Sequence, residues 1–252
     1  RNLEVGGSAV VQAAGEIIDK GKAIAANLFE ATPDRIEFED GAFFEPETNN
    51  SIVIGDVIDA SFDGSKLPDG MEAGQLNTGT TYERGAVSIP NGCHATEVEV
   101  DPETGAIDVV GYWVVDDFGT IINPMLADGQ VMGGIAQGIG QALTEQVLYD
   151  EETGQLVTGS FLDYALPRVD DIPMMEIEYY EDAPTAKNPL GVKGAGEAGC
   201  VGALPAVVNA VLDALKDHGV VHLEMPLTPE SVWRAIRDKG AFDPEGLMSD
   251  VL

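Results

Sequence analysis

The chain has 252 residues, 44 acidic and 13 basic, and its formal net charge of −31 at pH 7 argues against nucleic acid as a partner because phosphate would be repelled. Two cysteines, Cys93 and Cys200, are too few for a disulfide framework or an iron–sulfur cluster, and we expect both to be buried thiols in a reducing compartment. The sequence contains no run of eighteen apolar residues, so it predicts no membrane span, and no secretory signal is visible.

The first part of the chain predicts a long helix followed by short strands. Apolar residues recur at helical spacing over 6–30, which predicts the helix. Residues 34–44 alternate around an Asp-Gly pair, the signature of a β-hairpin, and 51–62 predict a short strand that runs into a helix. Residues 63–80 are rich in Gly, Asp, Asn and Thr and are typical of a long loop.

The rest of the chain predicts a second hairpin, one more strand and three helices. Two alternating strands over 94–119 flank the turn sequence DPETG. Residues 123–147 have a helical pattern, 174–180 alternate as a strand, and 200–219 form an apolar helix. A Thr cap, a Pro at the first helical position and a closing Gly predict the last helix at 228–240. Because strict βαβ alternation is absent, we expect an α+β fold of mixed sheets with packed helices.

Three glycine-bearing stretches are candidate cofactor contacts: VGGSA at 5–9, GGIAQGIGQA at 133–142 and GVKGAGEAG at 191–199. Glycines ahead of a helix expose N–H groups with the positive end of the helix dipole behind them, which favours phosphate. The predicted helix at 123–147 carries Gly129, Gly133, Gly134, Gly138 and Gly140. So much glycine indicates that something packs very close to that backbone.

The stretch at 191–199 holds one acid and one base among small residues. Its GAGEAG resembles the dinucleotide fingerprint, but the required strand does not precede it, which argues against a Rossmann unit. Taken alone, Glu197 has two interpretations: a turn or cap residue that favours the helix dipole, or a general base held in a dry site. Lys193 is either a phosphate contact or a surface charge.

Three longer segments carry a resemblance to a known family: 90–107, 114–168 and 188–215, which contain the Gln-Gly-x-Gly and Gly-x-Gly-Glu motifs. Together they resemble the C-terminal half of the molybdopterin-binding large subunit of the xanthine oxidase family, in particular the bacterial aldehyde oxidoreductase and carbon monoxide dehydrogenase-like subunits. The resemblance implies that 1–252 is a C-terminal molybdopterin-binding region, with two intertwined subdomains at about 1–120 and 121–252.

The resemblance also implies roles for single residues. Glu197 matches the catalytic glutamate beside the molybdenum, and Gln137 matches a glutamine that hydrogen-bonds the pterin. The remaining cofactor contacts it implies are Lys193, Gly194, Ala195 and Gly196, in the loop before that glutamate, and Arg1 and Asn2, at the end of a Ser-Arg-Ser-like loop in which Asn2 replaces the usual serine. No side chain is expected to ligate the metal, because the three histidines are scattered along the chain.

By the same resemblance, we expect part of a molybdenum hydroxylase that oxidises an aldehyde or an N-heterocycle, with molybdopterin in its cytosine dinucleotide form. Electrons would leave through [2Fe–2S] clusters to FAD, both on partner chains. The expected partners are the upstream part of the large subunit, an iron–sulfur subunit and an FAD subunit, in a cytoplasmic dimer of heterotrimers that acts on a small molecule.

Other interpretations are open. The chain begins at Arg1, inside a cofactor-contact motif, so we expect a fragment or a split subunit. A carbon monoxide dehydrogenase portion is the main enzymatic alternative, and a non-catalytic assembly subunit that keeps the fold is another. The strong negative charge fits a solvated acidic surface in a salty cytoplasm or, alternatively, an acidic face for a basic partner.

Overall fold

In the computed structural model, which describes residues 2–238, the chain forms two compact units. Unit 1 ends at Val87 and includes Ala186–Leu190, and unit 2 holds Ser88–Thr185 and the chain from Gly191. The boundary that we expect near residue 120 therefore lies at 87/88, while the return of 186–190 to unit 1 interleaves the two units along the chain. The boundary differs because the hairpin before residue 120 shares a core with the helices that follow it.

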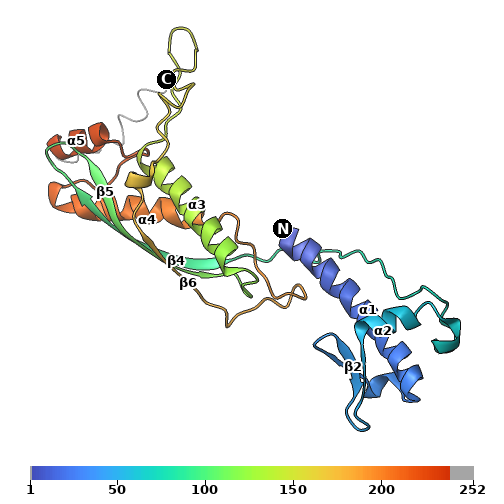
Figure 1. Ribbon diagram of the computed structural model, residues 1–252. Coiled ribbons are helices and arrows are strands. Elements are labelled where there is room, and N and C mark those ends of the chain that lie inside the picture. The colour runs from blue at the N-terminus through green and yellow to red at the C-terminus, as the bar shows by residue number, and fades with distance from the viewer. Residues whose placement is uncertain (1, 239–252) are drawn as a thin grey trace. The chain divides into compact units, whose positions relative to one another are not determined.

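Unit 1 combines one long helix with a three-stranded antiparallel sheet of order β1-β2-β3 (Figure 1). Its elements are η1 (Leu3–Gly7, a π-helical turn), α1 (Ser8–Phe29), η2 (Pro33–Arg35), β1 (Glu37–Glu39), β2 (Ala42–Glu45), β3 (Asn50–Val53), α2 (Ile54–Ala60) and η3 (Gly64–Lys66). The predicted long helix, hairpin and strand-to-helix segment all form. Ile24, Phe43 and Val57 are fully buried in the core of this unit.

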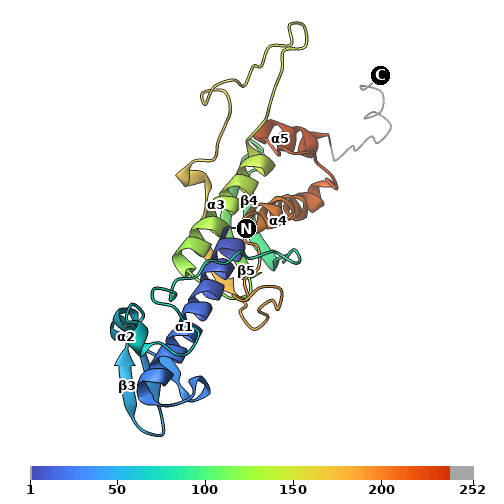
Figure 2. The ribbon, with the colours of Figure 1, turned by 90° about the vertical axis from the view of Figure 1, so that its right-hand side faces the viewer.

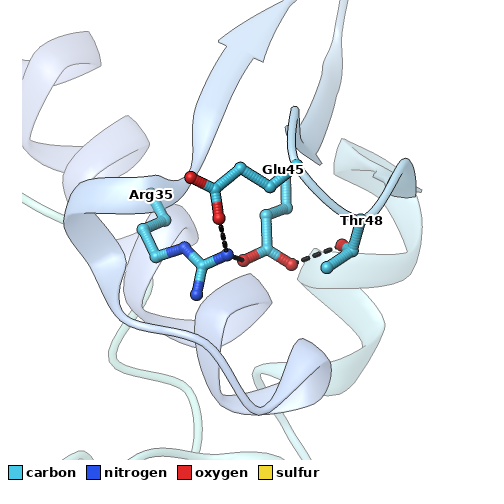
Figure 3. Close-up of polar contacts among 4 residues, drawn as sticks. Arg35, Glu45 and Thr48 are labelled. Carbon is cyan, nitrogen blue, oxygen red and sulfur yellow. Dashed lines mark hydrogen bonds and ion pairs between the residues drawn. The ribbon is translucent and has the colours of Figure 1, made fainter.

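A buried carboxylate is held at the end of β2 in unit 1. Glu45 is only 2% exposed, and its Oε1 lies 2.9 Å from Nη2 of Arg35, while its Oε2 accepts a hydrogen bond from the Thr48 hydroxyl. Figure 3 shows the Arg35 guanidinium beside the Glu45 carboxylate. The same Nη2 of Arg35 also forms an ion pair with the exposed carboxylate of Glu47. Because an unpaired buried charge costs free energy, the Arg35 guanidinium offsets the cost of burying the Glu45 carboxylate.

Unit 2 places two helices on one face of a three-stranded sheet of order β4-β5-β6 (Figures 1 and 2). β4 pairs antiparallel with β5, and β6 pairs parallel with β5. The elements are β4 (Asn91–Val100), β5 (Ile107–Asp117), α3 (Pro124–Leu143), η4 (Val169–Asp171), β6 (Met175–Tyr179), α4 (Ala198–Leu215), η5 (Lys216–His218) and α5 (Pro229–Arg237). The α+β prediction is confirmed, as are the predicted hairpin, strand and helices of this unit, while the closing Gly240 of the last helix lies outside the described residues. The expectation that both cysteines are buried is wrong for Cys93, which is exposed.

The hairpin turn of unit 2 forms as its sequence predicts. In DPETG, the Asp101 carboxylate accepts hydrogen bonds from the Glu103 N–H at 2.9 Å and the Thr104 hydroxyl at 2.7 Å. Gly105 closes the turn at φ 75°, where other residues are strained. It also lies against α5, because a Cβ there would be 2.0 Å from the Pro229 carbonyl oxygen.

One helical stretch of the described residues, Ala198–His218, is long and apolar enough by length and composition to cross a membrane. Core helices have the same composition, and this helix has a buried face in the core of unit 2, formed by Ala203, Val207, Val211 and Leu215. The stretch is therefore weak support for a membrane span.

Between α3 and η4 the chain leaves the body of unit 2 and returns (Figure 1). Within the excursion, Tyr149 and Leu156 form an antiparallel bridge, and the Val157 N–H donates to the Leu148 carbonyl oxygen at 2.8 Å. It exposes large apolar side chains, with Tyr149 at 63%, Phe161 at 84% and Leu162 at 93% exposure. So much exposed apolar surface is typical of a region that another chain covers.

Candidate active site

Four of the five glycines of α3 separate into two faces, and the fifth, Gly140, lies against the side chains of Glu145 and Pro167. Gly134 and Gly138 face α4: a Cβ on Gly134 would lie 2.9 Å from the Cys200 nitrogen, and one on Gly138 would lie 2.5 Å from Cβ of Ala203. Gly129 and Gly133 lie on the other face, and a Cβ on either would meet nothing within 4 Å. The expected close packing is therefore helix–helix contact for one set of glycines, while the other set leaves bare backbone on an open face.

The open face of α3 continues to Gln137. Residues 129, 133 and 137 follow one another at four-residue spacing, so they lie along one stripe of the helix. Gln137 is exposed, as Gln130 is on the adjoining stripe. The result is a track of two unobstructed glycines that ends at an amide side chain, on which a flat group can lie against backbone.

Glu197 begins α4 as its N-cap, but its side chain makes no capping hydrogen bond. The side chain is exposed in this chain. The dry surroundings that we expect for a general base are therefore not supplied by residues 2–238. What the structure does supply is a fixed helix behind the carboxylate, because a Cβ on Gly199 would lie 2.5 Å from the Val131 carbonyl oxygen of α3.

The loop before Glu197 is anchored at its start to the end of β5. The Lys193 N–H donates to the Phe118 carbonyl at 2.7 Å, and its ammonium pairs with the Asp117 carboxylate at 2.5 Å. Both side chains are nearly buried, at 12% and 13% exposure. Lys193 is therefore not a free surface charge: its ammonium is committed to a carboxylate 76 residues earlier.

The electrostatics of Asp117 agree with this anchor. Burial acts to raise the pKa of its carboxyl, but the hydrogen bonds from Lys193 and from the Gly119 N–H, with the Lys193 charge, outweigh it and hold the pKa below its ordinary value. The Asp117 carboxylate therefore stays ionised and keeps its ion pair with Lys193 at the start of the loop. A cofactor contact by the Lys193 side chain, which remains a prediction, would have to form while this ion pair holds.

The end of the loop is held by a residue that sequence reasoning missed. Nε2 of Gln130, on α3, donates to the Gly196 carbonyl oxygen at 2.9 Å. No local pattern connects these residues, which are 66 positions apart. The other predicted loop residues, Gly194 and Ala195, lie between the two anchors and are half-buried.

A buried polar cluster lies beneath α4. Nδ1 of His94 is 2.8 Å from the Tyr112 hydroxyl, and its Nε2 is 3.5 Å from Oδ1 of Asp116. Burial, and secondarily the Asp116 charge, raises the pKa of Tyr112 well above its ordinary value. The His94 ring packs against Gly202, where a Cβ would be 2.4 Å from the ring. This cluster packs α4 onto the sheet and does not reach the open face of α3.

The first glycine stretch differs from expectation. Gly6 and Gly7 lie inside a continuous helix that already includes Asn2, because η1 leads directly into α1. Their N–H groups are therefore not the open helix entrance that we predict for a phosphate. Asn2 is exposed and makes no side-chain cap, so the contact expected of it stays a prediction, and Arg1 lies outside the described residues.

Comparison with known proteins identifies the family of the chain. Residues 1–173 match the molybdopterin cofactor-binding domain. The chain belongs to this family. It is 43% identical to the nicotine 6-hydroxylase large subunit of Paenarthrobacter nicotinovorans over 98% of its own length and 30% of that relative, and 31% identical to the carbon monoxide dehydrogenase large chain of Hydrogenophaga pseudoflava over 94% and 29%.

Solved structures agree with the family. The fold matches quinoline 2-oxidoreductase from Pseudomonas putida 86 with a TM-score of 0.87 and 38% identity, over 94% of this chain and 30% of that one. The chain thus spans about 30% of the length of the relatives it matches. The family resemblance expected from the sequence is confirmed, while the roles of Glu197, Gln137 and the loop residues remain predictions.

Proposed function

We propose that the chain is the cofactor-binding part of the large subunit of a molybdenum hydroxylase that oxidises an N-heterocycle. The observation that carries the proposal is the open face of α3, with two unobstructed glycines leading to Gln137, in a chain of the molybdopterin-binding family. Relatives named for nicotine and quinoline favour an N-heterocycle over the aldehyde that the sequence leaves open.

The residues present fit a bulky, flat cofactor. Neither Gly129 nor Gly133 has a neighbour within 4 Å of its Cβ position, so a ring system can approach the helix backbone directly. The exposed amide of Gln137 can both donate and accept hydrogen bonds at the end of this track. When bound, the molybdenum–pterin group supplies the redox chemistry, and the protein positions it and tunes its surroundings.

In this proposal Glu197 is the general base. Its carboxylate projects from the N-terminus of α4, whose first turn is fixed in backbone contact with α3 at Gly199. The side chain is uncapped and exposed, so it is free to accept a proton from a group beside it. We propose that the desolvation useful to such a base comes from the rest of the large subunit.

The assembly proposal rests on the exposed apolar excursion and on the relatives. The exposed side chains of Tyr149, Phe161 and Leu162 are typical of a surface that another chain covers, and one relative is named as a subunit of a dehydrogenase complex. We propose that the upstream part of the large subunit and separate iron–sulfur and FAD subunits complete a cytoplasmic dimer of heterotrimers. The cytosine dinucleotide form of the cofactor belongs to the same proposal.

The experiment compares glycine variants in the complete enzyme. Gly133→Ala places a methyl group on the open track, so molybdenum and pterin content should fall at least several-fold. Gly15→Ala, in the middle of α1 with nothing within 4 Å, is the matched control and should retain cofactor. Full cofactor content in Gly133→Ala would contradict the proposed binding face.

Two other functions remain distinguishable. The 31% identity to a carbon monoxide dehydrogenase large chain supports a carbon monoxide-oxidising enzyme as the second candidate. Reduction of the purified enzyme by carbon monoxide, but not by nicotine or quinoline, would favour it. A non-catalytic assembly subunit predicts a complex that contains no molybdenum.

A further inference from the structure

We propose that Gln130 is a positioning residue, which fixes the Gly196–Glu197 peptide and thereby aims the Glu197 carboxylate. This inference rests on the proposed role of Glu197. Its direct support is one hydrogen bond, from Nε2 of Gln130 to the Gly196 carbonyl oxygen at 2.9 Å.

The hydrogen bond holds the peptide group that links Gly196 to Glu197. A peptide group is planar, so the Gly196 carbonyl and the Glu197 nitrogen lie in one plane. Holding the Gly196 oxygen therefore fixes the direction from which the chain enters Glu197, whose φ is −115° and ψ is −4°. The direction of the Glu197 side chain follows from that backbone orientation.

On the helix side, the Glu197 carbonyl oxygen accepts a hydrogen bond from the Val201 N–H at 3.0 Å, and on the loop side the Gln130 bond is the hydrogen bond that the described residues make to the Gly196–Glu197 peptide. Gly196 has no neighbour within 4 Å of its Cβ position, and Gly194 meets only the Ser88 carbonyl oxygen at 3.6 Å, an ordinary contact. Glycine has wide backbone freedom, so two glycines around Ala195 form a pliable segment. The Lys193–Asp117 ion pair anchors the start of that segment, and Gln130 anchors its end.

Gln130 is itself well placed to be an anchor. It precedes Val131, whose carbonyl is in backbone contact with Gly199 in the first turn of α4. The same turn of α3 therefore meets α4 and reaches Gly196. Residues 130, 133 and 137 also follow helical spacing, so the anchor borders the proposed cofactor face.

The test uses Gln130→Glu, which keeps the shape of the side chain but, when ionised, has no N–H to donate to the Gly196 oxygen. Gln141→Ala is the control, since Gln141 is exposed on the same helix and its side chain makes no hydrogen bond to the described residues. In the full chain without cofactor, the amide order parameters of Gly196 and Glu197 should drop from about 0.85 to below about 0.6 in Gln130→Glu only.

In the complete enzyme, Gln130→Glu should slow the reductive half-reaction by about 10- to 100-fold, because a small misplacement of a reacting group costs that much. Molybdenum content and the substrate KM should stay within twofold of wild type. Gln130→Asn retains an amide donor and should recover part of the rate.

The outcomes separate this inference from the proposed function. Unchanged order parameters would overturn the positioning role whatever the activity. Lower order parameters with an unchanged rate would also overturn it, and the proposed function would stand if Glu197→Gln is inactive. An active Glu197→Gln enzyme would instead remove the proposed base.

Discussion

The contact between α3 and α4 predicts opposite effects for two adjacent glycines. Gly134→Ala would place a methyl group 2.9 Å from the Cys200 nitrogen and 3.0 Å from the Gly199 Cα, whereas Gly133→Ala meets nothing within 4 Å. The neighbours of Gly134 are backbone atoms, which cannot rotate away. Relief requires the two helices to move apart, and overpacking of this kind costs about 1–3 kcal/mol.

The magnitude follows from the balance of this cost with helix propensity. Alanine in a helix interior is better than glycine by about 0.5–1 kcal/mol. Gly133→Ala should therefore stabilise unit 2 by about 0.5–1 kcal/mol, while Gly134→Ala, in which the overpacking cost opposes the same gain, should destabilise it by up to about 2.5 kcal/mol. The two variants should differ by the overpacking cost, about 1–3 kcal/mol, although they are neighbours on one helix.

Urea denaturation followed by tryptophan fluorescence measures this difference. Both tryptophans, Trp113 and Trp233, lie in unit 2, so the signal reports that unit alone. A Gly134→Ala variant as stable as Gly133→Ala would show that the two helix backbones are not in contact. Because Gly133→Ala should gain stability yet lose cofactor, a fall in its molybdenum content cannot be ascribed to unfolding.

Two further predictions concern buried charge and pH. Arg35→Met leaves the buried Glu45 without its cation and should destabilise unit 1 by about 1–3 kcal/mol in urea denaturation. Glu47→Gln removes the exposed partner of Arg35 and should cost less than about 1 kcal/mol. Equal costs would contradict the role of Arg35 in balancing the buried Glu45 charge. The pKa of Tyr112 is raised above its ordinary 10.0, so above pH 10 the unfolded chain loses a proton that the folded one keeps, and stability should fall by up to about 1.4 kcal/mol per pH unit. The wild-type fall between pH 10 and 11 should be steeper than that of Tyr112→Phe, and parallel slopes would contradict the burial of this phenol.

Most secondary structure was predictable because its causes are local. Helical spacing predicts α1 and α4, and the Thr228 cap with its following proline predicts α5. In the structure the Thr228 hydroxyl accepts a hydrogen bond from the Ser231 N–H at 3.2 Å. The glycines at 5–9 misled, since glycine disfavours helix in general but a helix can run through it where packing permits.

The candidate site was only partly predictable, since its geometry is set by distant contacts. The sequence indicates that α3 is packed closely, but only the position of α4 separates Gly134 from Gly133. Likewise, the partner of Lys193 is 76 residues away and that of Gly196 is 66 residues away. Sequence reasoning can propose Glu197 as a base, but it cannot show which side chains hold its loop.

The central claim is that this chain supplies the catalytic base, Glu197, beside a molybdenum–pterin group. The most direct measurement is single-turnover reduction of the complete Glu197→Gln enzyme by an N-heterocycle such as quinoline, with molybdenum content determined on the same sample. We expect wild-type molybdenum content and a reduction rate lower by at least about 100-fold, the lower end of what general-base removal costs. Near-normal reduction by that variant at full molybdenum content would contradict it.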